Sequence, residues 1–165
     1  MQHTHAVSRE EVPEAGFTLI ELMTVVLIIA ILIAVLIPTF VGAKGRAQDR
    51  AAQSSLRNGL TAAKVVFSER GDFTMATVAA LDAGEPGLAW VDSGSASTGP
   101  NSISVDPVNA GYIVLAGQSK SGGCFFVSDD ESATALGVLY ARAASTSCAA
   151  SGAPAVGDPA WGAAW

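Results

Sequence analysis

The side chains that most often carry chemistry are few in this sequence, and their positions narrow what they can do. Both histidines, His3 and His5, lie near the start of the chain, and the only two cysteines, Cys124 and Cys148, lie far along it. We expect these cysteines to form a disulfide if that part of the chain is outside the cell, and to be free thiols in a reducing cytosol. No phosphate-binding glycine motif or metal-ligand spacing is present. The sequence therefore argues against an enzyme and predicts no cofactor.

Two sets of acidic residues remain as candidates for a site. Glu21 is an isolated acid at the start of a long apolar run, and a carboxylate at mid-bilayer costs up to about 3 kcal/mol. It is either tolerated at a membrane interface or retained because a cationic group meets it. Asp129, Asp130 and Glu131 form the one cluster that could hold a cation, with calcium as the plausible ion. The alternative for this cluster is a solvated hairpin turn.

The element that must position Glu21 is a helix through the apolar run. From Leu22 to Ile37 the only side chain with a hydrogen-bonding group is Thr24, and this run is longer than most strands. At a rise of about 1.5 Å per residue, a helix over residues 17–41 can cross the roughly 30 Å hydrocarbon core. Pro38 lies inside this helix and removes one amide donor, so we predict a kink or local loosening there.

Gly16, the run Phe17-Thr18-Leu19-Ile20-Glu21 and the apolar helix that follows resemble the type IV prepilin signature. This resemblance implies that a prepilin peptidase removes residues 1–16 as a leader by cutting between Gly16 and Phe17, and that the new amino group of Phe17 is methylated. It also implies that Glu21 pairs with the Phe17 amine of a neighbouring subunit during assembly. An amine and a carboxylate that lose water together cost far less than either alone.

What the resemblance implies for function is a structural subunit of an extracellular type IV pilus, used for adhesion, motility or DNA uptake. Its partners would be further copies of the chain in a helical filament, the prepilin peptidase, an assembly ATPase and platform proteins. The chain would be stored as a single-pass precursor in the cytoplasmic membrane. Two alternatives stay open: a pseudopilin of type II secretion or minor pilin, and an anchored surface-binding protein that does not polymerise.

The distribution of basic residues conflicts with export of the C-terminal part. Counted by the positive-inside rule, Lys44, Arg46 and Arg50 after the span outweigh Arg9 before it, and would place the C-terminal part in the cytoplasm. The cleavage signature and the cysteines favour export, and we give them more weight. A secretory signal peptide cut at Val41-Gly42-Ala43 is a competing interpretation, but an h-region normally has about 7 to 15 residues.

Residues 42–70 are predicted to continue the helix in amphipathic form and to end near Arg70-Gly71. Helical spacing creates an apolar stripe that needs a sheet to cover it, formed by Ala52, Leu56, Leu60, Ala63 and Phe67. Beyond Gly71 only Lys120 and Arg142 are basic, against nine acids. We therefore expect no direct binding of nucleic acid by residues 71–165 alone.

Residues 71–165 are predicted to form a globular head, which makes the fold class α+β. Four runs separated by short turns indicate an antiparallel sheet of about four strands, at Ser102–Val105, Tyr112–Ala116, Cys124–Ser128 and Leu136–Arg142. A connecting loop over 72–100 could include a short helix at Met75–Asp82 and a short strand at Ala89–Asp92. The tail from Ala149 is expected to be irregular or mobile, with Trp161 and Trp165 packed loosely on their own domain or docked on a neighbouring subunit.

Overall fold

The structure is a computed structural model of the 165-residue chain and describes residues 16–132, 137–143 and 147–165. Its first helix, α1 (Leu19–Arg70), has 52 residues, and the chain divides into two compact units, Met1–Phe40 and Val41–Trp165. The predictions that concern residues 1–15 lie outside the described residues. The predicted end of the helix is confirmed: Gly71 has a φ of +68°, and its N–H donates to the carbonyl of Phe67 at 2.6 Å. Glycine is the residue that adopts this C-terminal cap most easily.

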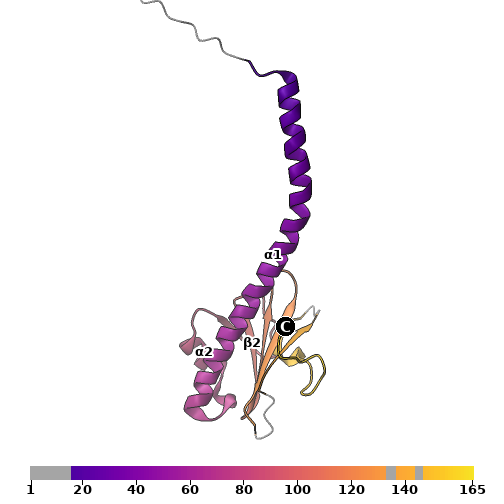
Figure 1. Cartoon of the computed structure of the whole chain (residues 1–165). Coiled ribbons are helices and arrows are strands. Elements are labelled where there is room, and N and C mark those ends of the chain that lie inside the picture. The colour runs from indigo at the N-terminus through magenta and orange to yellow at the C-terminus, as the bar shows by residue number, and fades with distance from the viewer. Residues whose placement is uncertain (1–15, 133–136, 144–146) are drawn as a thin grey trace, which may run out of the picture. The chain divides into compact units, whose positions relative to one another are not determined.

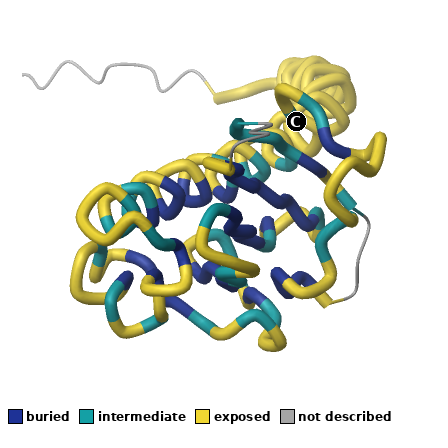
Figure 2. Tube along the Cα trace, turned by 90° about the horizontal axis from the view of Figure 1, so that it is seen from below, coloured by how far each residue is buried: buried dark blue, intermediate teal, exposed yellow. Residues whose placement is uncertain are grey.

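In the second unit, the amphipathic half of α1 packs on a sheet through the predicted apolar stripe. Ala52, Leu56, Leu60 and Ala63 are buried, and Phe67 is partly buried and stacks on Phe73 with ring centroids 4.4 Å apart. Helix and sheet approach closely, because a Cβ on Gly117 of the sheet would lie 3.1 Å from Cγ of Leu56. Figure 2 shows this buried face of the helix as dark blue segments.

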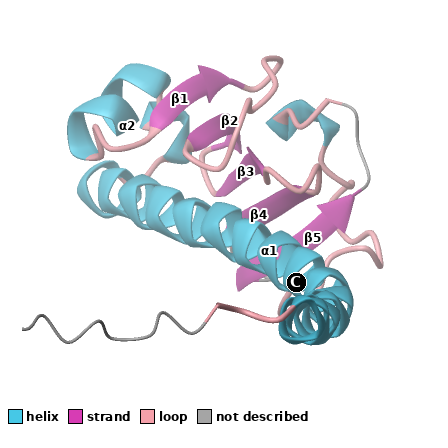
Figure 3. Ribbon diagram, turned by 90° about the horizontal axis from the view of Figure 1, so that it is seen from above, coloured by secondary structure: helices cyan, strands magenta, loops and turns pink. Residues whose placement is uncertain are grey.

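The sheet has five strands in the order β1-β2-β3-β4-β5, as Figure 3 shows. The strands from β2 onward pair antiparallel with their sequence neighbours, which confirms the predicted hairpin arrangement. They extend beyond the predicted runs, and Leu136 of the last predicted run lies outside the described residues. Their bounds are β1 (Ala89–Asp92), β2 (Ser102–Asn109), β3 (Tyr112–Gln118), β4 (Cys124–Asp130) and β5 (Gly137–Ala143).

The connection between α1 and β2 differs from the expected loop in two respects. In place of the predicted short helix there is a 3₁₀ turn, η1 (Phe73–Met75), followed by a helix, α2 (Val78–Gly84). Thr77 caps the start of α2, because its hydroxyl accepts from the N–H of Ala80 at 3.3 Å. The short strand β1 is confirmed at its predicted bounds but pairs parallel to β2. It makes a fifth strand where about four were expected, and the sheet is therefore mixed rather than purely antiparallel.

Both faces of the sheet are covered, as Figures 1 and 3 show. Alternate residues of β3 illustrate the result: Ile113 and Leu115 join the core under α1, whereas Val114 and Ala116 join a second core under the C-terminal segment. That segment contains a short 3₁₀ turn, η2 (Ala150–Gly152), and is tied to β4 by the disulfide between Cys124 and Cys148. The predicted disulfide is therefore present, and it closes the second core.

The C-terminal tail is irregular, as predicted, and its two tryptophans are packed on their own domain, which was one of the two expected arrangements. Trp161 is 9% exposed and donates from its ring N–H to the carbonyls of Pro154 and Ala155, both at 3.1 Å. Trp165 donates to the carbonyl of Phe126 at 3.0 Å, and its ring meets the edge of Tyr140 with centroids 4.4 Å apart. The Arg57 guanidinium of α1 lies 5.0 Å from the centroid of the Trp165 ring. Trp165 therefore links α1 to the sheet.

Replacing Trp165 with alanine is expected to lower the free energy of unfolding of the head by about 2 kcal/mol, because a partly buried aromatic ring and one hydrogen bond are lost together. The measurement is urea unfolding of the detergent-solubilised chain, followed by circular dichroism. Val156→Ala is the matched control, since Val156 is 58% exposed, and it should change stability by less than about 0.5 kcal/mol. Equal stability of the two variants would show that Trp165 is not part of the fold.

Candidate functional site

The predicted cleavage junction lies in an exposed segment just before α1. Gly16, Phe17 and Thr18 precede the first helical residue and are all exposed. A Cβ built on Gly16 would have no other atom within 4 Å, and its backbone is not in the positive-φ region. Local packing therefore gives no reason for a glycine at this position. The bond after Gly16 lies in an exposed segment.

Glu21 and Thr18 form a capping box at the start of α1. The Glu21 carboxylate oxygen Oε2 accepts from the Thr18 backbone N–H at 3.0 Å and from the Thr18 hydroxyl at 2.8 Å. In return, the Glu21 N–H donates to the Thr18 hydroxyl at 3.3 Å. This reciprocal pattern satisfies amide donors that a helix leaves free at its first turn. The pattern Thr-x-x-Glu before an apolar run is its sequence signal, and our sequence analysis did not use it.

The apolar part of α1 exposes all its large side chains in the isolated chain. Between Phe17 and Val41 the exposed fraction of these side chains runs from 47% at Val25 to 82% at Phe17. The Thr24 hydroxyl donates to the carbonyl of Ile20 at 2.8 Å, so it presents no unpaired donor to a lipid environment. By length and composition the helix can cross a membrane. It continues through Pro38, and the predicted kink there stays a prediction.

The acidic cluster lies at the end of β4, where Asp129 and Asp130 are buried, so the solvated turn expected as its alternative is wrong. Asp129 is fully buried in the strand, and its Oδ2 lies 3.0 Å from Nζ of Lys64. Oε1 of Glu131 lies 3.2 Å from the same nitrogen. A lysine ammonium therefore occupies the position that a calcium ion would need between these acids. In the part of the chain that the structure describes, no three His, Cys, Asp or Glu side chains gather as metal ligands.

Burial and charge act in opposite directions on this ion pair. Burial raises the pKa of Asp129 above its ordinary value, and the nearby Lys64 offsets this only in part. At Lys64 burial would lower the pKa, but the two carboxylates outweigh it and raise the pKa. The folded state therefore binds a proton on Asp129 more tightly than the unfolded state does. Protonated Asp129 therefore stabilises the folded state. This contribution to the free energy of unfolding is fully present below the pKa that Asp129 has in the unfolded chain. It is lost as the pH rises through the higher pKa that Asp129 has in the folded chain.

Replacing Lys64 with methionine should expose the cost of this buried carboxylate. We expect the free energy of unfolding at pH 7 to fall by about 2 kcal/mol. This is less than the usual cost of breaking a buried ion pair, because the Lys64 side chain is 41% exposed. The loss should shrink toward pH 5, because Asp129 is more easily protonated without its partner. The measurement is urea unfolding at both pH values. Lys64→Met with Asp129→Asn is the control and should recover stability at pH 7, whereas a pH-independent loss would contradict this account.

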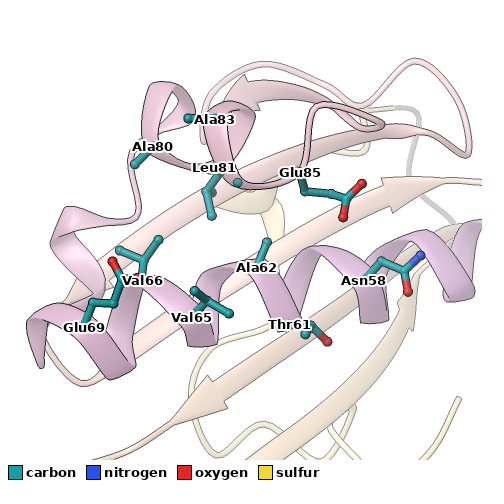
Figure 4. Close-up of a pocket in the computed structure, with 11 residues that line it drawn as sticks. Asn58, Thr61, Ala62, Val65, Val66, Glu69, Ala80, Leu81, Ala83 and Glu85 are labelled. Atoms are coloured by element: carbon teal, nitrogen blue, oxygen red, sulfur yellow. The ribbon is translucent and has the colours of Figure 1, made fainter.

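A groove of about 440 Å³ lies between α1 and α2 (Figure 4). Its wall on α1 includes Thr61 and Val65, and its wall on α2 includes Ala80 and Leu81. The only ionisable groups that line it are Glu69 and Glu85, which Figure 4 shows near its two ends. The other lining residues are small, apolar or uncharged, among them Asn58, Ala62 and Val66.

Comparison with known families locates the recognisable part of the chain at this N-terminal site. Residues 13–37 match the prokaryotic N-terminal methylation motif, which is the signal motif of type IV pilins and prepilins. No curated protein and no solved structure matches the chain. The motif supports a type IV pilin-like or pseudopilin precursor and points to a structural subunit rather than an enzyme. It also implies processing by a prepilin peptidase and anchoring in a membrane.

Proposed function

We propose that the chain is the structural subunit of an extracellular type IV pilus. A prepilin peptidase cuts between Gly16 and Phe17, the new amine of Phe17 is methylated, and the processed chain polymerises through residues 17–41. The observation that carries the proposal is the exposure of every large apolar side chain in this segment, most of which lies within the methylation motif at residues 13–37. A helix this apolar can leave a bilayer only if other apolar surface replaces the lipid, and copies of the same helix supply such surface.

One feature of the chain favours an exported head, and another favours cleavage after Gly16. The disulfide between Cys124 and Cys148 requires an oxidising compartment, which the cytosol is not. The exposed segment before α1 gives a peptidase access to the bond after Gly16. In the resembled family the acid that matches Glu21 sets the position of each subunit, and we assign that role to Glu21 with the Phe17 amine of a neighbouring copy as its partner.

The test is to shear filaments from the surface of expressing cells and to sequence the amino terminus of their main subunit. We expect N-methylated Phe17 at this position. An amino terminus at Lys44 would support a secretory signal peptide instead. Recovery of the processed chain only in membranes would favour an anchored surface-binding protein, and recovery as a minor component of the sheared fraction would favour a minor pilin or pseudopilin. A Gly16→Val variant is the control and should accumulate uncut.

A further inference from the structure

In the second unit, Val41–Trp165, called the head from here on, most of the charged side chains form two groups at opposite ends of the amphipathic half of α1. Contacts with the sheet define the two ends. Asp49 near the beginning of this half accepts from the hydroxyl of Ser121 in the turn between β3 and β4, and lies 3.7 Å from Arg142 near the end of β5. Lys64 meets Asp129 near the end of β4. Asp49 and Lys64 are separated by about 22 Å of helix, and Arg70 lies further on.

The two ends have opposite net charge, although the whole chain is acidic. The end around Asp49, here called the basic end, has five basic residues and one acid, a net charge of +4: Lys44, Arg46, Arg50, Lys120, Arg142 and Asp49. The end beyond Lys64, here called the acidic end, has two basic residues and six acids, a net charge of −4: Lys64, Arg70, Glu69, Asp72, Asp106, Asp129, Asp130 and Glu131.

Most of the basic end is available to a partner. Lys44, Arg46, Arg50 and Lys120 are exposed, and none of them forms an ion pair within the described residues. Glu69 and Glu131 at the acidic end are also exposed, and Asp106 is partly exposed. Charges of one sign gathered at one place repel one another, and a partner of opposite sign relieves that repulsion. The acidic end of a second head has the sign and size of charge that the basic end requires.

We propose that the basic end of one head contacts the acidic end of the head of a second copy. This inference rests on the proposed filament function, and it adds a contact between heads to the packing of residues 17–41. The contact joins two different surfaces of the same chain, so each copy keeps one surface free for a further copy. Such a contact can repeat along an open helical filament. At physiological ionic strength charges act over about 8 Å, so opposite charges must lie close together across the contact.

Charge reversal at each end provides the test in expressing cells. The first variant carries Lys44→Glu, Arg46→Glu and Arg50→Glu, which makes both ends of the head negative. The second carries Glu69→Lys, Asp106→Lys and Glu131→Lys, which makes both ends positive. We expect each variant alone to yield at least tenfold less sheared filament than the unchanged chain. Expressed together, the two variants should form mixed filaments with a yield within about threefold of the unchanged chain, because each supplies the opposite charge that the other lacks.

The controls separate this contact from folding, from total charge and from the proposed function. Recovery in the mixture shows that both variants fold. A variant with Asp82→Lys, Asp92→Lys and Asp158→Lys alters residues counted in neither end, changes the total charge as much as the second variant does, and should assemble normally. Undiminished assembly of both single variants would overturn the head contact while the filament function stands. If each variant alone yields less filament and the mixture does not recover the yield, the head contact is also overturned. In that case, release of the first variant alone from membranes would favour anionic lipid as the partner of the basic end. Absence of filaments from the unchanged chain would contradict both proposals.

Discussion

A Glu21→Gln variant should be cut and methylated normally but should yield at least about a hundredfold less filament, because the Phe17 amine of each neighbour would enter an apolar environment without a counter-charge. Glutamine is the informative replacement. It can take the place of glutamate in a capping box, so the start of α1 is preserved while the charge is removed. The measurement is the amount of sheared filament relative to the processed chain that remains in the membrane.

The matched control for this variant is Thr18→Ala. It removes the hydroxyl that bonds to Glu21 but leaves the carboxylate, so it tests the capping box alone. Loss of an N-cap costs about 0.5 to 2 kcal/mol, and we expect a decrease in filament yield of about thirtyfold or less. Normal assembly of Glu21→Gln together with poor assembly of Thr18→Ala would show that Glu21 acts only as a helix cap, and the pairing role would have to be abandoned.

Removing the disulfide should lower the free energy of unfolding of the head by about 3 to 4 kcal/mol, given the 24-residue separation of Cys124 and Cys148. The structure indicates where the loss acts first: the bond holds the segment that contains Ala150 and Trp161 over the second face of the sheet. We expect this segment to separate from the sheet and expose the second core. The double variant Cys124→Ala, Cys148→Ala can be compared with the unchanged chain by urea unfolding in detergent.

Reductant supplies the control for the disulfide prediction. It should destabilise the unchanged chain by nearly as much as the double variant and should have no effect on the variant itself. Equal stability of the oxidised and reduced chains would contradict the prediction. Alkylation of the chain recovered from filaments should find no free thiol, which would also decide against the cytoplasmic location that Lys44, Arg46 and Arg50 suggest by the positive-inside rule.

Long periodic patterns made α1 and its buried stripe predictable. The apolar run fixes the first half of the helix by its length, and the spacing of Leu56, Leu60 and Ala63 fixes the buried side of the second half. Gly71 marks the end because few other residues adopt its backbone conformation at low cost. These signals are local, and each is repeated or chemically specific.

The features that were missed depend on partners distant in sequence. Asp129 sits in a run of three acids, which favours a solvated turn, and its burial depends on Lys64 in another element. Strand β1 has only four residues, so its own sequence does not say that it joins β2 or in which direction. Trp165 belongs to an aperiodic tail, and its position depends on Phe126, Tyr140 and Arg57 together. The Thr18 and Glu21 contact is different, because its signal is local and could have been recognised.

The contact between Thr18 and Glu21 has a consequence for the time that a subunit waits before use. Both residues lie beyond the bond that the peptidase would cut, so the contact survives processing. A carboxylate that already accepts two hydrogen bonds is less costly to keep in lipid than a bare one. If the chain polymerises as proposed, the Phe17 amine of a neighbour must bind the Glu21 carboxylate more strongly than the Thr18 hydroxyl and amide that it displaces.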